Sequence, residues 1–268
     1  MSGRLLDRIA IVTGAGCVGP GWGNGRATAV RFAEEGARIF AVDRNLDSVA
    51  ETVERVKAAG AEIVTHQCDV TDNAAVAAMV KACADRFGRI DVLVNNVGGS
   101  AHGGPVEMSE EVWDAQVDYN LKSVFLTCKH VLPVMEKQKG GAIVNVASTS
   151  GIRFTGAFQV GYAATKAGVI QLSRVVAVQY AAKGIRVNTV VPGQLHTPMV
   201  EARLAKQWRP AWPSSAPAAT WRPCWHNGLS AFRPASWATA AIPPMPRCSS
   251  PPTKRVSSPV RRSWSTAG

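Results

Sequence analysis

Short apolar runs rich in β-branched residues alternate with helical patterns along residues 8–190. The expected strands are 8–13, 37–42, 62–67, 91–95, 142–146 and 185–190, and the expected helices are 26–36, 46–59, 73–87, 110–135 and 160–182. Strands that are apolar along their whole length and are separated by helices indicate a parallel sheet covered on both faces. We therefore predict an α/β fold of one domain, a doubly wound parallel sheet with helices on both faces.

The net charge of +11 is concentrated in the last quarter of the chain. All 19 acidic residues lie at or before Glu201, whereas residues 206–268 hold nine basic residues, 11 of the 16 prolines and six of the eight tryptophans. We therefore divide the chain into a globular domain, 1–206, and an irregular tail, 207–268, which we expect to be disordered. Because the basic excess lies in that tail, we expect neither a nucleic-acid nor a membrane partner.

The remaining composition excludes several classes of protein. No apolar stretch approaches the roughly 18 residues of a membrane helix. The apolar run 9–12 is too short for a signal peptide, so we expect a cytoplasmic protein. Six cysteines without a C-x-x-C pair and scattered histidines predict no metal site and no disulfide framework. Trp113 and Phe125, 12 residues apart on a predicted helix, are expected to serve packing rather than chemistry.

A glycine-rich loop, residues 13–25, joins the first strand to the first helix. Bare backbone amides at a helix N-terminus can bind a pyrophosphate, although a flexible connection is the simpler interpretation of the glycines alone. A G-x-G-x-x-G pattern begins at Gly14, but a helix in that register would be interrupted by residues 20–23. We predict instead that the helix starts at Gly23, Asn24 and Gly25, which makes the loop about five residues longer than usual.

Asp43 ends the second predicted strand, 18 residues after Gly25. A carboxylate at this position can accept hydrogen bonds from both hydroxyls of an adenosine ribose and would repel a 2′-phosphate. The pattern therefore favours NAD over NADP. Arg44 follows immediately and could soften this preference, although we interpret it as a solvated surface arginine.

Tyr162 and Lys166 are four residues apart on a predicted helix, so their side chains share one face. An ammonium group beside a phenol stabilises the phenolate, which suits the phenol to proton transfer near neutral pH. The Y-x-x-x-K pattern is common, so this spacing alone is weak support for catalysis.

The order of several motifs resembles that of the short-chain dehydrogenase/reductase family. These motifs are Thr13-Gly14 with its glycine loop, Asp69-Val70, Asn95-Asn96-Val97-Gly98, Asn120, Ser148, Tyr162-x-x-x-Lys166, and the stretch from Ile185-Arg186-Val187-Asn188 to Pro192-Gly193. The resemblance covers about residues 5–200. It implies a Rossmann-like fold and an NAD-dependent alcohol dehydrogenase or carbonyl reductase that interconverts a small secondary alcohol and a ketone. It also implies a homo-oligomer, a dimer or tetramer if the tail is intact, with the helices near 110–135 and 160–182 at subunit contacts.

The resemblance further implies individual roles. Tyr162 would be the general acid/base, Lys166 would assist it and bind the nicotinamide ribose, and Ser148 would polarise the substrate oxygen. Asn120 would anchor a water in the proton relay. Ser148 is 14 residues before Tyr162, one more than is usual, so Thr149 and Ser150 remain alternative hydroxyls. The implied cofactor contacts are Asp69 and Val70 at the adenine, Asn96 at the adenosine ribose, Pro192, Gly193 and Leu195 at the nicotinamide, and Thr197 at the carboxamide, together with Gly14, Gly23, Asn24, Gly25, Asp43, Tyr162 and Lys166.

Residues 208–268 lack the substrate-covering helix, last strand and glycine-rich close with which the family ends. The residues from Ser236 onward can be encoded by codons that also encode a second sequence when they are read from the third base of each codon. That second sequence contains a helix and a strand and ends in E-I-V-V-D-G-G, which is the family's expected ending. We hypothesise a frameshift near Gln207 or Trp208. A chain of this sequence would have little stability and turnover, and a catalytically impaired dinucleotide-binding protein is the alternative function. The apolar, aromatic stretch 151–160 hints at a hydrophobic or cyclic secondary alcohol as substrate.

Overall fold

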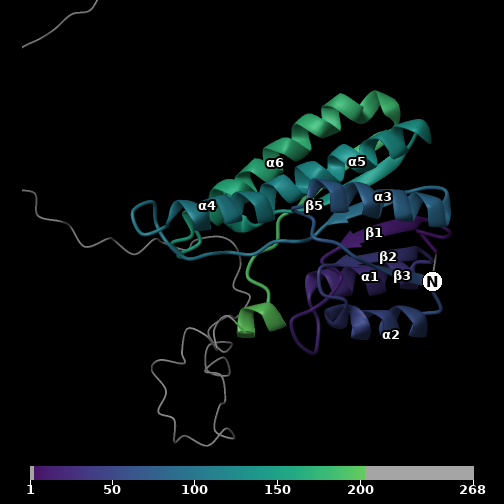
Figure 1. Ribbon diagram of the computed structural model, residues 1–268, viewed down its shortest axis with the longest axis horizontal. Coiled ribbons are helices and arrows are strands. Elements are labelled where there is room, and N and C mark those ends of the chain that lie inside the picture. The colour runs from purple at the N-terminus through teal and green to yellow at the C-terminus, as the bar shows by residue number, and fades with distance from the viewer. Residues whose placement is uncertain (1–2, 203–268) are drawn as a thin grey trace, which may run out of the picture. The chain divides into compact units, whose positions relative to one another are not determined.

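The computed structural model describes residues 3–202, which contain a six-stranded parallel sheet (Figure 1). The strands are β1 (Ile9–Thr13), β2 (Arg38–Asp43), β3 (Ile63–Gln67), β4 (Val92–Asn95), β5 (Gly141–Val146) and β6 (Ile185–Val190). They lie in the order β3-β2-β1-β4-β5-β6. The predicted doubly wound parallel sheet is confirmed. The predicted tail, 207–268, lies outside the described residues.

Helices connect successive strands. They are α1 (Asn24–Glu34), α2 (Ala50–Ala58), α3 (Asn73–Phe87), α4 (Glu110–Val117), α5 (Ser123–Lys137) and α6 (Val160–Tyr180). Short turns of other helix types are η1 (Leu46–Val49), η2 (Asp118–Lys122), η3 (Thr149–Gly151) and η4 (Ala181–Lys183). The start of α1 at Asn24 confirms the predicted helix start, with Gly23 as an extended N-cap.

Two apolar clusters hold helices against the two faces of the sheet. Neighbouring residues of a strand point to opposite faces, so Ile9 and Ile11 of β1 belong to one cluster and Ala10 and Val12 to the other. The first cluster packs against α3, α5 and α6, and the second against α1 and α2. Figure 1 shows these two sets of helices on opposite sides of the strands. The expected cover on both faces is therefore present.

The strand order reverses between β1 and β4. From β1 the chain builds the sheet outward to β3, and from β4 it builds outward to β6 in the opposite direction. In open α/β sheets ligands bind at such a reversal point, outside the carboxyl ends of the strands. The glycine-rich loop follows β1 and the segment that begins at Asn96 follows β4, so both lie at this reversal point.

The helix predicted over 110–135 is divided. The π-helical turn η2 separates α4 from α5, and Asn120 lies in this turn. Its Nδ2 atom donates to the carbonyl oxygens of Gln116 at 3.0 Å and Gly99 at 2.9 Å, and its Oδ1 atom accepts from the Gly99 amide at 3.0 Å. A π-turn adds one residue to a helical turn, often at functional sites, and apolar spacing does not reveal it.

Strand β6 is an edge of the sheet that the described residues form, and it pairs with β5. A groove of about 500 Å³ runs beside it, lined by Ala177, Ala181 and residues 184–188. Val190 at the end of the strand is 50% exposed. The backbone and apolar surface of this edge are therefore open in the described part of the chain.

Candidate functional site

The glycine loop is folded tightly against the start of α1. Gly14 has a φ of +63°, which favours glycine. A Cβ atom at Gly25 would lie 1.8 Å from the carbonyl oxygen of Gly14, so a side chain there would push the helix away from the loop. Asn96 donates from Nδ2 to the same carbonyl at 3.0 Å. Gly14, Gly25 and Asn96 thus join the loops after β1 and β4.

The carboxylate of Asp43 is fixed at the end of β2. Its Oδ2 atom accepts from the Gly16 amide at 3.0 Å, and its Oδ1 atom accepts from the Asn45 amide at 3.1 Å. A Cβ at Gly16 would lie 2.8 Å from Oδ2. Arg44 is exposed, as expected for a surface arginine, and its Cζ atom lies 5.8 Å from the centre of the Tyr119 ring.

Lys166 is the buried cation of the site. It is 2% exposed, and its Nζ atom donates to the carbonyl oxygen of Val146, at the end of β5, at 2.8 Å. The same Nζ atom lies 5.7 Å from the centre of the Tyr162 ring. Burial lowers the pKa of Lys166 from 10.5 to about 8. The ammonium is therefore still charged at neutral pH, and two of its three N–H donors remain for other acceptors.

Gly98 brings Lys166 and Asn120 together. A Cβ atom at residue 98 would lie 2.9 Å from Lys166 Nζ and 3.0 Å from Asn120 Oδ1. The bare backbone of Gly98 therefore occupies the space between these two side chains. Gly98 is part of the N-N-x-G motif but was not predicted as a site residue, because Lys166 and Asn120, which lie against it, come from two segments distant in the sequence.

Ser148 follows β5 and caps η3. Its Oγ atom accepts from the Ser150 amide at 3.2 Å, which leaves the hydroxyl hydrogen to be donated. The Ser150 hydroxyl instead lies 3.3 Å from Thr155 Oγ1. Gly151 seats η3 on α6, because a Cβ there would lie 2.7 Å from the backbone of Lys166. Ser148 is therefore held on a segment that packs against the helix of Tyr162 and Lys166.

The other predicted cofactor residues are spread along the same edge of the sheet. Asp69 follows β3, and hydrogen bonds from Thr71 hold the pKa of its carboxyl below the usual range. Val70 is 4% exposed and belongs to the core. The carbonyl of Pro192 accepts from the Thr149 amide at 3.0 Å, which joins the segment after β6 to η3. Residues 193–197 continue this segment, with Leu195 49% exposed.

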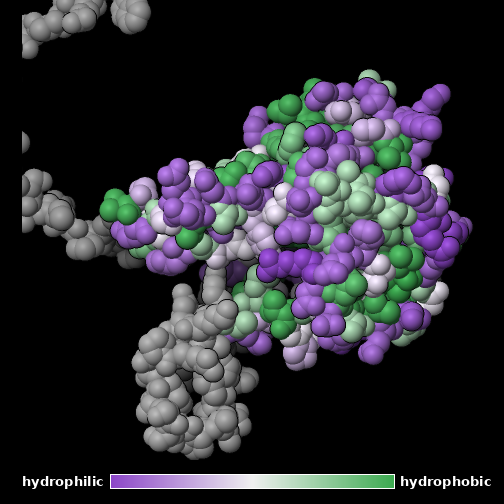
Figure 2. Space-filling view, viewed as in Figure 1, coloured by the Kyte–Doolittle hydropathy of each residue, from purple (hydrophilic) through white to green (hydrophobic). Residues whose placement is uncertain are grey.

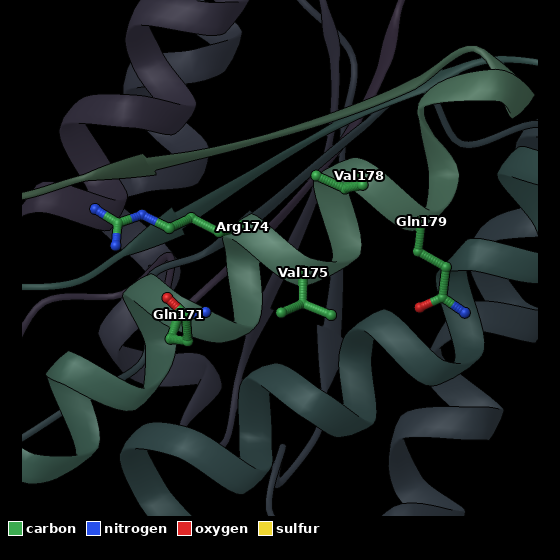
Figure 3. A pocket seen from close by; sticks show the side chains of 5 residues that line it. All are labelled: Gln171, Arg174, Val175, Val178 and Gln179. Atoms are coloured by element: carbon green, nitrogen blue, oxygen red, sulfur yellow. The ribbon is translucent and has the colours of Figure 1, made fainter. Parts of the chain in front are cut away.

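A groove of about 540 Å³ lies away from these residues, on the outer side of α6. It is lined by Gln171, Arg174, Val175, Val178 and Gln179, and Figure 3 shows all five side chains extending from this one helix. Phe125 on α5 and Trp113 on α4 are 52% and 39% exposed, so both helices place these rings at the surface of the described chain.

The described residues show no further candidate centre. Within residues 3–202, no group of three or more His, Cys, Asp or Glu residues is placed to hold a metal ion. No helix in this range is long and apolar enough to cross a membrane. Figure 2 shows polar residues mixed with small apolar patches over the visible face.

Comparisons with known proteins identify the same family as the sequence motifs do. A sequence model of the short chain dehydrogenase family matches residues 8–208. Levodione reductase of Leifsonia aquatica is 43% identical over 216 residues, which cover 80% of this chain and 78% of the relative. A Burkholderia xenovorans structure, assigned as a short-chain dehydrogenase/reductase, is 62% identical with a TM-score of 0.76, covering 76% of this chain and 78% of that one. Carveol dehydrogenase of Mycobacterium avium, solved with NAD, is 33% identical with a TM-score of 0.72 and 81% of both chains covered.

Proposed function

Because the chain belongs to the short-chain dehydrogenase family, we propose that it is an NAD(H)-dependent oxidoreductase that interconverts a secondary alcohol and a ketone. One observation carries the proposal: Lys166 Nζ contacts the end of β5, faces the ring of Tyr162 and abuts Gly98 beside Asn120. A buried ammonium and a phenol at the carboxyl edge of a doubly wound sheet form an acid/base pair where such sheets bind ligands.

The residues that follow β1 and β4 fit a nicotinamide dinucleotide. The glycine loop leaves backbone amides at the N-terminus of α1 for a pyrophosphate, and Lys166 has two unused donors for ribose hydroxyls. The NAD complex of carveol dehydrogenase supports the same cofactor here. When bound, the dinucleotide supplies or accepts the hydride.

The proton is handled by the chain's own side chains. The Tyr162 hydroxyl gives its proton to the ketone oxygen during reduction and takes it back during alcohol oxidation, while the Lys166 ammonium stabilises the phenolate. Ser148 donates its hydroxyl hydrogen to the same substrate oxygen, because its Oγ atom accepts from the Ser150 amide and keeps that hydrogen for another acceptor. Asn120 would anchor a water of the proton relay and holds the Gly98–Gly99 segment against Lys166.

Asp43 supports a preference for NAD over NADP. Its carboxylate is held by the Gly16 and Asn45 amides at the end of β2, where an adenosine ribose would lie. A 2′-phosphate brought to this position would meet a fixed negative charge, which costs binding energy in a partly buried site.

Three aromatic rings support a hydrophobic or cyclic substrate. The Phe158 ring centre lies 5.7 Å from that of Phe154 and 6.5 Å from that of His102. The two loops that carry them are joined by hydrogen bonds from the Gly103 amide to the Phe158 carbonyl at 2.9 Å and from the Val160 amide to the Gly103 carbonyl at 3.1 Å. Both phenylalanines are more than half exposed just before the helix of Tyr162, where an apolar ring could cover them.

We also propose that the chain forms a homo-oligomer through α5 and α6 when the tail of the protein is intact. The exposed apolar side chains Phe125, Val175 and Val178 on these helices support such a contact.

Titration of the full chain with NADH and NADPH, followed by the fluorescence of the reduced nicotinamide, tests the cofactor. We expect saturable NADH binding that is retained in Tyr162→Phe, and weaker NADPH binding. Absence of saturable NADH binding would overturn the proposed function.

A further inference from the structure

The guanidinium of Arg26 lies inside the bend of the glycine loop. Arg26 is the third residue of α1 and is 2% exposed. Its Nη1 atom donates to the Gly21 carbonyl at 2.5 Å and to the Glu51 carboxylate. Its Nε atom donates to Thr52 Oγ1 at 3.2 Å, and its Nη2 atom to the Ser48 carbonyl at 3.4 Å. The charge is therefore paired, and all three guanidinium nitrogens have partners.

The same network holds the loop at its beginning and middle. The buried Thr52 hydroxyl donates to the Ala15 carbonyl at 2.8 Å, and the Cys17 amide donates to the Ser48 carbonyl at 3.1 Å. The third link is the bond from Arg26 of α1 to the Gly21 carbonyl, and Arg26 is itself bonded to Ser48 of η1 and to Glu51 and Thr52 of α2. A short apolar side chain at residue 26 would remove the link at the far end.

A second arginine extends the network to the outer part of the loop. Arg55 donates to Glu51 from both Nε and Nη2, at 2.9 and 2.7 Å, and its Cζ atom lies 4.4 Å from the centre of the Trp22 ring. On its other side the loop lies beside Pro198, whose Cβ atom would be 3.5 Å from a Cβ at Gly19. The extra residues of the loop therefore lie between α2 and the segment that follows β6.

This loop needs a polar anchor. It contains six glycines between residues 14 and 25, so ordering its backbone costs more conformational entropy than ordering other residues. Its larger apolar side chains, Val18 and Trp22, are 64% and 48% exposed and do not enter the core. A loop that is already ordered in the free protein loses less conformational entropy when a ligand binds, so the ligand binds more tightly.

We propose that Arg26 is a positioning residue for the cofactor, which fixes the extended glycine loop so that its amides are arranged for the pyrophosphate before binding. The inference rests on the proposed function. Arg26 touches neither the cofactor nor the substrate in this role and acts through the backbone carbonyl of Gly21.

Calorimetric titration of the full chain with ADP-ribose and with adenosine tests the proposal. ADP-ribose carries the pyrophosphate, and adenosine tests the adenosine site without any phosphate. We expect Arg26→Met to raise the Kd for ADP-ribose about tenfold, the effect of losing one hydrogen bond to a charged group, and to change the Kd for adenosine about twofold or less. The matched control is Arg31→Met on the exposed side of α1, where Arg31 pairs with Glu34 and Glu35. This variant should have the wild-type Kd values for both ADP-ribose and adenosine.

Thr52→Val gives a second, milder test that keeps the side-chain shape and removes the link to Ala15. Amide hydrogen exchange of residues 15–23 should be faster in both variants than in wild type, and ADP-ribose binding should be weaker in both. Unchanged ADP-ribose binding in folded Arg26→Met, or in Thr52→Val if the arginine variant does not fold, would overturn the inference. Equal weakening of adenosine and ADP-ribose would also overturn it. A wild-type chain that binds neither NADH nor ADP-ribose would overturn the proposed function itself.

Discussion

The Nζ atom of Lys166 and the Oδ1 atom of Asn120 meet the same bare backbone, that of Gly98, where an added methyl carbon would lie 2.9 Å from one and 3.0 Å from the other. The packing of three segments that are far apart in sequence therefore requires glycine at residue 98. Lys166 comes from α6, Asn120 from the π-turn η2, and Gly98 from the segment after β4.

Gly98→Ala should lower kcat about 100-fold. The φ angle of Gly98 lies outside the left-handed region, so the effect is steric. The added methyl group would displace Lys166 from Tyr162, and a misplacement of about 1 Å can lower the rate about 100-fold. Steady-state kinetics measure kcat in the chain with its frame restored after Gln207, because we expect little turnover from the chain without that change. The control is Gly99→Ala, whose Cβ would lie 3.4 Å from the Tyr119 ring, an ordinary contact. Similar kcat values for the two variants would contradict the steric role of Gly98.

Lys166→Met should stabilise the fold while it removes activity. Burial lowers the pKa of Lys166 to about 8, and a shift of this size costs about 3 kcal/mol of folding free energy while the group is charged. Loss of the hydrogen bond to Val146 offsets about 1 kcal/mol of the gain. We expect the free energy of unfolding at neutral pH to rise by about 1–2 kcal/mol in urea titrations, and turnover to fall at least about 100-fold.

The same variant gives a pH dependence with a defined sign. Between pH 8 and 10.5 the native wild-type chain has lost the Lys166 proton that the unfolded chain still binds, so the free energy of unfolding of wild type rises with pH relative to Lys166→Met. The advantage of the variant should therefore be constant below pH 8 and shrink above it. An advantage that does not change over this range would show that Lys166 is not a buried cation in the folded protein.

Asp43→Asn should shift the cofactor preference. Loss of the negative charge removes the repulsion of a 2′-phosphate, so NADPH should bind at least about tenfold more tightly relative to NADH. Fluorescence titration of both nucleotides measures the ratio. Asp47→Asn, which removes an exposed charge from η1, serves as the control and should leave the ratio at the wild-type value. The assignment of Asp43 fails if the two variants behave alike.

Val178→Glu should dissociate the proposed oligomer, because a charge would enter an apolar contact. Val178 is 81% exposed on α6, and Val106, which is 90% exposed before α4, provides the control Val106→Glu. Light scattering of the chain with its frame restored after Gln207 should give a dimer or tetramer for wild type and the control. A monomer for wild type would rule the contact out.

Resequencing the gene from codon 200 onward tests the predicted frameshift. The family match ends at residue 208, and β6, the last strand of the described residues, is an edge of their sheet. We expect one inserted or deleted base near codon 207 or 208. An intact reading frame for residues 208–268 would contradict the hypothesis.

The sequence predicted the parts of the fold that repeat. Apolar runs located the six strands of the described sheet, and the inner strands β1, β2 and β4 are buried along most of their length. The glycine pattern placed the start of α1 at Asn24. The sequence did not predict η2, since a π-turn changes the helix without changing its apolar spacing. It also missed the burial of Arg26, because partners such as Gly21 and Thr52 are brought together only by tertiary packing.

The most direct test of the central claim is NADH oxidation with a panel of cyclic and aromatic ketones. It is measured for the chain with its frame restored after Gln207, taken as wild type, and for Tyr162→Phe and Tyr180→Phe in that same chain. Tyr180 ends α6 and packs against the core, so its variant makes the same chemical change outside the site. We predict ketone-dependent oxidation by wild type and Tyr180→Phe, and a loss of about 100-fold or more in Tyr162→Phe with NADH binding retained. Equal turnover of the two variants, or no turnover by a chain with its frame restored, would contradict the account.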